Sequence, residues 1–224
     1  MRTQRANCEI CSDTGFEDVG GSGVKDCSCK QRKIRENRLS SIPPRFSTVK
    51  LEEIVPRPEI HPRQKEILVH LTANPVGSYI LAGGPGCGKT MMMWALYRAA
   101  VEQTNRRVVG CSFAELVREM RDFISTSIAG SIPRLPRLRP EDLRQTEVKY
   151  AIFLDDLDKE KPSEYTLSQL FELVNGIYEF EHQLVVTTNF SVTRLMDHFD
   201  RLDDRFGGPI LRRVINNAKL FEMF

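Results

Sequence analysis

The sequence predicts an α/β fold: a parallel sheet flanked by helices, preceded by a small cysteine-rich module. Three observations support this prediction. Short apolar runs of strand character alternate with amphipathic helical segments, as they do in βαβ proteins. One strand-to-helix junction carries a complete glycine-rich phosphate-binding motif. Four of the six cysteines lie within the first 29 residues, where they form two close pairs.

The length and composition allow one full domain and a small appendage. The chain has 224 residues, of which 41% are hydrophobic and 28% charged, the proportions of an ordinary soluble globular protein. No apolar run approaches about 20 residues, so no transmembrane span and no membrane partner are expected. Residues 1–7 carry two arginines without a following apolar stretch, so no secretory signal is expected. The expected location is cytoplasmic.

The first element is a candidate zinc module. Its ligands would be two cysteine pairs, Cys8 with Cys11 and Cys27 with Cys29. Four thiolates at such spacing can surround one tetrahedral Zn²⁺. A segment of about 30 residues cannot bury a core large enough to fold alone, so the bound metal would supply folding energy. Two disulfides, free thiols and an iron–sulfur cluster are the alternatives that the spacing leaves open.

A basic segment follows the cysteines. Residues 30–38 contain five positive charges and one glutamate, which predicts a basic helix that could contact nucleic acid or an acidic partner. A solvated linker helix is the equal alternative. Consecutive prolines within residues 41–46 then interrupt the chain. We therefore expect a zinc-binding module with a basic linker helix over residues 1–40 and a second, larger domain over residues 41–224 that carries the phosphate-binding motif.

The phosphate-binding loop occupies residues 83–90 and matches the motif G-x-x-x-x-G-K-[ST] at every position. The loop residues are Gly83, Gly84, Pro85, Gly86, Cys87, Gly88, Lys89 and Thr90. A buried strand is predicted over residues 78–82 and a helix over 91–100, so the loop joins the two. Lys89 would face the β- and γ-phosphates of ATP, and Thr90 would offer its hydroxyl to Mg²⁺. The alternative is a plain glycine turn.

The third predicted strand ends in two carboxylates. It follows a predicted strand over residues 107–111 and an amphipathic helix over 113–124, and it spans residues 151–154. Asp155 is expected to hold Mg²⁺, and Asp156 to orient and deprotonate the attacking water. Most ATPases with this loop and strand pattern carry glutamate at the position of Asp156. Aspartate is one methylene shorter, so we expect ATP hydrolysis to be slow or to depend on a partner. An acidic turn that closes a buried strand is the alternative.

A helix is predicted over residues 164–179 and a fourth strand over 183–188, which delivers Asn189 at its carboxyl end. The amide of Asn189 could hydrogen-bond the γ-phosphate and the lytic water. Taken alone, Thr-Thr-Asn is a common strand ending. Its position after the phosphate loop and the Asp155–Asp156 pair, in the order expected for an ATPase site, favours a catalytic role for Asn189.

The last predicted elements are a helix that opens at residues 208–209 and a fifth strand over 219–223. An arginine just before this strand could reach the nucleotide site of a neighbouring copy and neutralise charge on the transferred phosphoryl group. Such a residue is called an arginine finger. Arg213 is the preferred candidate for this role, and Arg212 and Arg205 are the other candidates. Self-association would follow from such a trans finger. Surface arginines on an amphipathic helix are the alternative.

The order of these motifs resembles the DnaC/DnaI/IstB group of AAA+ ATPases across roughly residues 42–224. The motifs that carry the resemblance are Pro-Pro-Arg-Phe (43–46), the phosphate loop, Phe-Leu-Asp-Asp-Leu (153–157), Thr-Thr-Asn (187–189) and Arg-Arg-Val (212–214). The resemblance implies a P-loop AAA+ core with a five-stranded parallel sheet in the order 5-1-4-3-2, and it assigns Asn189 the role called sensor 1. The cysteine-rich opening resembles the zinc modules of DnaI-like loaders.

The resemblance also implies a function. Members of the group load the replicative hexameric helicase onto single-stranded DNA, or deliver a transposase to target DNA. We expect an ATP-dependent helicase loader whose zinc module holds the helicase. An IstB-type transposition regulator and a weakly hydrolysing nucleotide-switch adaptor are the alternatives. Two departures are evident: Ile177 precedes Tyr178 where the group usually has Arg-Tyr, and no full helical lid is expected after the fifth strand.

An irregular segment over residues 127–147 carries three arginines spaced by prolines: Arg134, Arg137 and Arg139. It could form an extended basic loop that faces DNA, or a mobile surface loop. Phe123 could stack on a base, but it lies on the apolar face of its helix, so a core position is expected.

Overall fold

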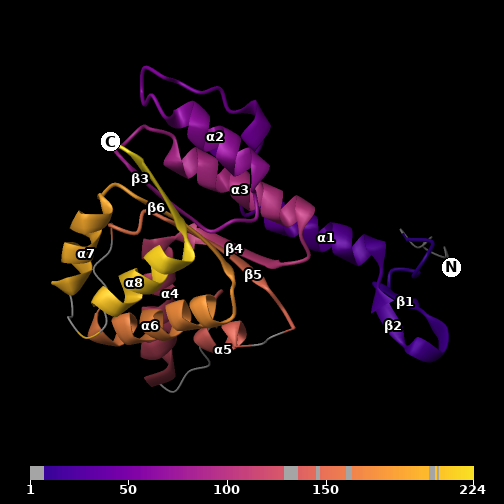
Figure 1. The fold of residues 1–224 in the computed structure, drawn as a ribbon. Coiled ribbons are helices and arrows are strands. Elements are labelled where there is room, and N and C mark those ends of the chain that lie inside the picture. The colour runs from indigo at the N-terminus through magenta and orange to yellow at the C-terminus, as the bar shows by residue number, and fades with distance from the viewer. Residues whose placement is uncertain (1–7, 129–135, 145–146, 160–162, 202–204, 206) are drawn as a thin grey trace. The chain divides into compact units, whose positions relative to one another are not determined.

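The computed structural model describes residues 8–128, 136–144, 147–159, 163–201, 205 and 207–224. Figure 1 shows its helices and strands in chain order. The chain divides into two compact units, Met1–Ser47 and Thr48–Phe224, and each is considered by itself. Within the described residues no helix is both long enough and apolar enough to cross a membrane.

The N-terminal unit contains an antiparallel hairpin and one helix. Strands β1 (Phe16–Asp18) and β2 (Val24–Asp26) pair across a glycine-rich turn, and α1 (Ser28–Leu39) follows. The predicted basic helix over residues 30–38 is confirmed within α1, whereas the hairpin was not predicted. None of the α1 residues is buried, so this helix adds no core to the unit.

The buried hydrophobic side chains in the described part of this unit are Cys11, Cys27 and Ile42. Two of the three are thiols rather than hydrocarbon groups. An apolar core of this size cannot offset the conformational entropy of an ordered chain. The stability of the unit therefore depends on what the cysteines bind.

The second unit alternates strands with helices. Its strands are β3 (Tyr79–Gly83), β4 (Arg107–Ser112), β5 (Tyr150–Asp155), β6 (Gln183–Thr188) and β7 (Lys219–Met223). Its helices are α2 (Gln64–Ala73), α3 (Lys89–Gln103), α4 (Phe113–Ile128), α5 (Pro140–Leu143), α6 (Glu164–Glu179), α7 (Val192–Asp200) and α8 (Gly207–Asn217). The predicted helix over 164–179 and the predicted strands over 183–188 and 219–223 are confirmed to the residue.

The five strands form one parallel sheet in the order β4-β5-β6-β3-β7. Numbered along the chain from β3, this order reads 2-3-4-1-5, which confirms the predicted order 5-1-4-3-2. The strand with the phosphate loop, β3, lies between β6 and β7. Because parallel strands end at one edge of the sheet, the residues that follow β3, β5 and β6 meet there.

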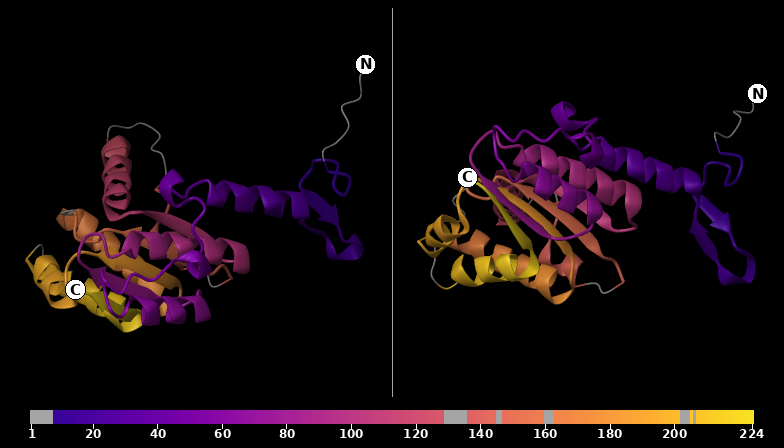
Figure 2. Two further views of the ribbon diagram at one scale, coloured as in Figure 1. Left: turned by 90° about the horizontal axis from the view of Figure 1, so that it is seen from above. Right: turned by 45° about the horizontal axis from the view of Figure 1, so that its top comes forward.

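Helices cover both faces of the sheet in the second unit. In Figure 1, α2 and α3 lie on one face, and α4, α6 and α8 lie on the other; the right-hand view of Figure 2 shows α3 and α8 on opposite sides of the sheet. Strand side chains alternate between the faces. Phe153 packs against Tyr97 of α3, with ring centroids 5.4 Å apart, whereas the adjacent Ile152 and Leu154 join the opposite core.

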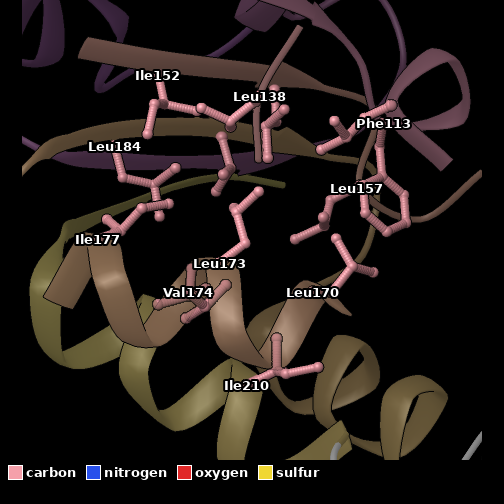
Figure 3. Close-up of a cluster of buried hydrophobic side chains, with 14 of the residues drawn as sticks. Phe113, Leu138, Ile152, Leu157, Leu170, Leu173, Val174, Ile177, Leu184 and Ile210 are labelled. Carbon is pink, nitrogen blue, oxygen red and sulfur yellow. The ribbon is translucent and has the colours of Figure 1, made fainter. Parts of the chain in front are cut away.

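The core on the α6 face explains the length of that helix. Figure 3 shows a row of α6 side chains directed at Ile152 and Leu184 of the sheet. This row consists of Leu170, Leu173, Val174 and Ile177, at the spacing of one helix face. Ile177 is 1% exposed, so the position where the group that the sequence resembles usually has arginine is a core position in this chain.

Two sequence-based expectations are refined by the structure. Phe123 is half-buried, while its neighbours on α4, Leu116 and Met120, are fully buried, so its core position is partial. Of the irregular segment over residues 127–147, positions 129–135 and 145–146 lie outside the described residues, and positions 140–143 form α5 rather than an extended loop. Proline at the first turn of α5 suits a helix start.

Candidate functional site

The phosphate loop turns sharply between β3 and α3. Gly86 and Gly88 have φ angles of +85° and +93°, in the left-handed region that glycine adopts without strain. Gly88 is the N-cap residue of α3, which begins at Lys89, and no side chain caps the first turn. The backbone N–H groups of this turn are therefore open to an anion, with the partial positive charge of the helix behind them.

The start of the loop is tied to the edge strand β7. The backbone N–H of Gly84 donates to the carbonyl of Met223 at 3.2 Å. A Cβ on Gly83 would lie 2.5 Å from that carbonyl oxygen, so only glycine fits there. Pro85 is exposed at the loop tip, whereas the Cys87 side chain is buried beneath it.

Lys89 is buried, with 5% of its surface exposed. Its Nζ donates to the carbonyl oxygens of Gly83 and Gly84 at 2.8 and 2.9 Å, and to Oδ1 of Asn189 at 3.1 Å. It also donates to Sγ of Cys87 at 3.6 Å. None of these four acceptors is a carboxylate, and Lys89 forms no ion pair within the described part of the chain. A buried ammonium without a counter-ion attracts an anion strongly, because little water screens it. The structure thus brings together two predicted site residues that are 100 positions apart.

A second group of predicted residues meets at the end of β5. The hydroxyls of Thr90 and Thr187 both donate to Oδ1 of Asp155, at 3.0 and 2.5 Å. Burial raises the pKa of the Asp155 carboxyl, while the two hydroxyl donors oppose the rise. Hard oxygen ligands of this kind suit Mg²⁺. Thr90 and Asp155, predicted from separate motifs to share this ion, are in direct contact.

Asp156 leaves the strand with a φ of +57°, a conformation that aspartate tolerates better than most residues. Its backbone N–H donates to Oγ1 of Thr187 at 2.9 Å, which ties the turn to β6. Its carboxylate accepts from Nζ of Lys159 at 2.6 Å, and this hydrogen bond raises the pKa of the Lys159 ammonium. The candidate catalytic base is therefore paired with a cation from its own turn.

Three site residues were not predicted. Gln64 of α2 is buried and donates from Nε2 to the Cys87 carbonyl at 3.1 Å, while its Oε1 accepts from the backbone of Arg57. Thr187 supports the Asp155–Asp156 turn, as described above. Asp158 accepts hydrogen bonds from the end of β6. Thr187 lies in the Thr-Thr-Asn motif, which by itself gives it no role, and no local motif marks Gln64 or Asp158. Each of the three acts on a partner distant in sequence.

The carboxylate of Asp158 contacts both the backbone and the side chain of Asn189. Its Oδ1 accepts from the backbone N–H of Asn189 at 2.7 Å and from Oγ1 of Thr188 at 2.9 Å. Its Oδ2 accepts from Nδ2 of Asn189 at 3.1 Å. Burial raises the pKa of the Asp158 carboxyl, but the donors on Asn189 and Thr188 outweigh it and leave the pKa below its usual value.

The candidate finger arginines lie on or near α8. The Arg213 guanidinium stacks 5.0 Å from the centroid of the Phe171 ring and donates to the carbonyl of Pro209 at 3.3 Å. These contacts do not bring Arg213 to the phosphate loop of its own chain. Arg212 is exposed, and Arg205 forms an ion pair with Glu164. No neighbouring copy is present in the structure, so the finger stays a prediction.

The predicted basic loop is less basic than its sequence suggests. Arg137 donates to Oε1 of Glu119 from Nε and Nη2, at 2.8 and 2.5 Å. Arg139 forms a two-bonded pair with Asp142, at 3.1 and 2.6 Å. Arg134 lies outside the described residues. Two of the three predicted positive charges are thus compensated within the chain.

The N-terminal unit brings its four cysteine sulfurs within 4.8 Å of one another. Cys8 and Cys27 lie 3.8 Å apart, and Cys11 and Cys29 lie 3.4 Å apart, all as free thiols. A tetrahedral ion with metal–sulfur bonds of about 2.3 Å separates its ligands by about 3.8 Å. A cluster of several irons would hold them further apart. The four residues therefore fit a single tetrahedral metal ion.

Hydrogen bonds shift the pKa values of the thiols in this cluster. The backbone N–H of Gly15 points at Sγ of Cys11, 3.3 Å away. Burial raises the pKa of the Cys11 thiol, but this N–H and the neighbouring thiols outweigh it and lower the pKa to about 6. The hydrogen bond with Cys11 raises the pKa of Cys29 to about 12. A metal ion would favour the thiolate form of all four.

Comparisons with known proteins find similar folds. The fold is similar to a structure titled "Crystal Structure of the DnaI", with a TM-score of 0.63, 16% identity and coverage of 82% of this chain and 95% of that one. A structure titled "Crystal structure of the DnaC helicase loader" matches with a TM-score of 0.59 and 18% identity, covering 81% of this chain and 100% of that one.

A third structure is titled "Replication initiator DnaA bound to AMPPCP and single-stranded DNA". It matches with a TM-score of 0.56 and 18% identity over 81% of this chain and 50% of its own length. At these identities the three likenesses concern the fold alone. The sequence itself matches the model of the ATPase family associated with various cellular activities (AAA) over residues 79–211, more than half of the chain. The chain therefore belongs to the AAA family of ATPases.

Proposed function

We propose that this protein is an ATP-dependent loader that binds the replicative hexameric helicase and single-stranded DNA and deposits the helicase at the start of DNA replication. The observation that carries the proposal is the convergence of Lys89, Asp155 and Asn189 at one edge of an AAA sheet. The fold is similar to those of structures titled DnaI and DnaC helicase loader, and a DnaA structure of similar fold is titled as bound to single-stranded DNA. We place the protein in the cytoplasm.

ATP would bind over the phosphate loop. Lys89 would exchange the carbonyls of Gly83 and Gly84 for phosphate oxygens, and the uncapped N–H groups of α3 would take further oxygens. Thr90 and Asp155, already in contact, would hold Mg²⁺. When bound, Mg²⁺ supplies positive charge that offsets charge on the reacting phosphates.

Two side chains would act on the attacking water. Asp156 would accept its proton, and Asn189 would orient it through its amide. The Asp156–Lys159 ion pair opposes this step, because the carboxylate oxygen that would take the proton already accepts a hydrogen bond from Lys159. This pair also favours a second candidate function, a nucleotide-switch adaptor that binds ATP and hydrolyses it weakly.

The cysteine cluster would hold Zn²⁺, and the N-terminal unit that it stabilises would bind the helicase. Exposed apolar side chains on this unit include Ile10, Val19 and Val24, which are 66%, 41% and 68% exposed. These side chains would contribute apolar contacts to the helicase. The exposed basic face of α1 would contribute contacts to DNA phosphates.

We predict that the zinc-loaded protein co-elutes with the hexameric helicase of its host in the presence of ATP. Gel filtration with in-line light scattering gives the mass of the complex. The Lys89→Ala variant, which loses the ammonium for the phosphates, is expected to bind ATP at least tenfold more weakly and to assemble poorly.

A parallel run with the cognate transposase tests the alternative. Assembly with the transposase and not with the helicase would move the protein to the IstB-type regulators and leave the ATP site standing. Unchanged ATP affinity in Lys89→Ala would contradict the site itself.

We predict one zinc ion per chain, measured by mass spectrometry of metals in the purified protein. Cys27→Ser should lose the ion, because three thiolates bind it far more weakly than four, and should lose helicase binding while ATP binding persists. Cys111→Ala is the matched control, since Cys111 is buried in the other unit. Iron in place of zinc, or full zinc content in Cys27→Ser, would refute the assignment.

We predict that Lys159→Met raises ATP turnover in the absence of partners. An ion pair as exposed as Asp156–Lys159 contributes up to about 1 kcal/mol, so a two- to fivefold rise is expected when the candidate base is released. Lys159→Arg keeps the pair and serves as the control. A fall in turnover with the methionine variant would show that Lys159 assists the reaction instead.

We predict that Arg213→Ala binds ATP normally but loses turnover by about 10³-fold or more, the range for arginine fingers. Arg212→Ala, an exposed neighbour, should retain turnover. Mixing Arg213→Ala with Lys89→Ala protein should restore part of the activity, because each supplies what the other lacks across a subunit boundary. Full turnover of Arg213→Ala alone would rule out the finger.

A further inference from the structure

We propose that Asp158 is a positioning residue that holds the amide of Asn189 in the orientation needed for ATP hydrolysis. This inference rests on the proposed ATPase function of the site. Asp158 belongs to neither the phosphate loop nor the Asp155–Asp156 pair, and it would act through Asn189 rather than on the nucleotide. Its three hydrogen bonds to Thr188 and Asn189 carry the argument.

The two partners of the Asn189 side chain are chemically opposite. A carboxylate can only accept hydrogen bonds, and an ammonium can only donate them. Oδ2 of Asp158 lies 3.1 Å from Nδ2 of Asn189, and Nζ of Lys89 lies 3.1 Å from its Oδ1. Rotating the amide by half a turn would place oxygen against carboxylate and nitrogen against ammonium. Electrostatics therefore selects one of the two orientations.

This orientation leaves a donor free for the reaction. The amide nitrogen carries two hydrogens, and Asp158 takes one of them. The second remains for a phosphate oxygen or for the attacking water. In the rotated amide the oxygen would repel a phosphate instead. Asp158 thus determines whether Asn189 presents a donor or an acceptor to the nucleotide site.

The turn that carries Asp158 is anchored to β6. The backbone N–H of Leu157 donates to the Thr187 carbonyl at 2.9 Å, and the Leu157 side chain is buried. The Asp156 N–H is tied to the Thr187 hydroxyl. With both preceding residues fixed, the carboxylate of Asp158 has a defined position against the end of β6. The same short turn therefore supports both the candidate base, Asp156, and the candidate sensor, Asn189.

The test is the Asp158→Asn variant, which keeps the shape of the side chain but replaces one acceptor oxygen with a donor. We expect kcat to fall at least tenfold while the affinity for ATP stays within twofold, because removal of one preorganised donor typically costs more than that. In the Asn189→Ala background the same substitution should cost nothing further. Glu179→Gln, an exposed carboxylate change on α6, is the matched control.

A second measurement does not depend on turnover. In protein with isotope-labelled asparagine, the side-chain amide resonances of Asn189 are assigned by their loss in Asn189→Ala. We expect Asp158→Asn to shift them and Glu179→Gln to leave them unchanged. If the protein proves to have no ATPase activity but the shift is observed, the proposed function fails and the positioning contact stands.

Two results would overturn the inference. One is an unchanged Asn189 amide signal in Asp158→Asn. The other is an equal loss of kcat from Asp158→Asn in the presence and absence of Asn189, since Asp158 would then act by another route. Thermal unfolding of each variant shows whether a loss of kcat reflects loss of the folded state.

Discussion

The candidate site depends on one buried charge, the ammonium of Lys89. A buried cation without a counter-ion is costly, and neutral oxygens from the end of β3 and from Asn189 after β6 offset that cost. This arrangement requires β3 and β6 to be neighbours, although 100 residues separate Lys89 from Asn189. The AAA strand order meets this requirement. The positions of the phosphate loop, the candidate magnesium ligands and the candidate sensor then follow from where these parallel strands end.

The two units depend on different interactions for their stability. The second unit buries continuous apolar layers on both faces of its sheet, so its fold needs no ligand. Within the described residues of the N-terminal unit, the buried hydrophobic side chains are two thiols and one isoleucine. They do not form an apolar layer like those of the second unit. A metal ion bound by those thiols would make folding of this unit a consequence of metal binding. A partner-binding function assigned to this unit would then depend on zinc as well.

The candidate catalytic groups form hydrogen bonds and ion pairs with neighbouring side chains. Asp156 is paired with Lys159, Asn189 is held between Asp158 and Lys89, and Asp155 accepts from two threonines. A polyphosphate over the loop would compete for Lys89 and so loosen one side of the Asn189 amide. Nucleotide binding and the geometry of the hydrolytic residues are thereby coupled through a few hydrogen bonds. Such coupling is what the proposed ATP-dependent loader would require.

The sequence by itself determined the parallel sheet, the phosphate loop, the Asp155–Asp156 pair and the two cysteine pairs, because each is a contiguous pattern with a local physical meaning. The tertiary structure alone decided the long-range support of the site, which is Gln64 on the phosphate loop and Asp158 against Asn189. It also neutralised Arg137 and Arg139, which the sequence presents as free charges. The sequence gives the chemical type of each side chain. The hydrogen-bond partners of Gln64 and Asp158 depend on which segments distant in sequence the fold brings together.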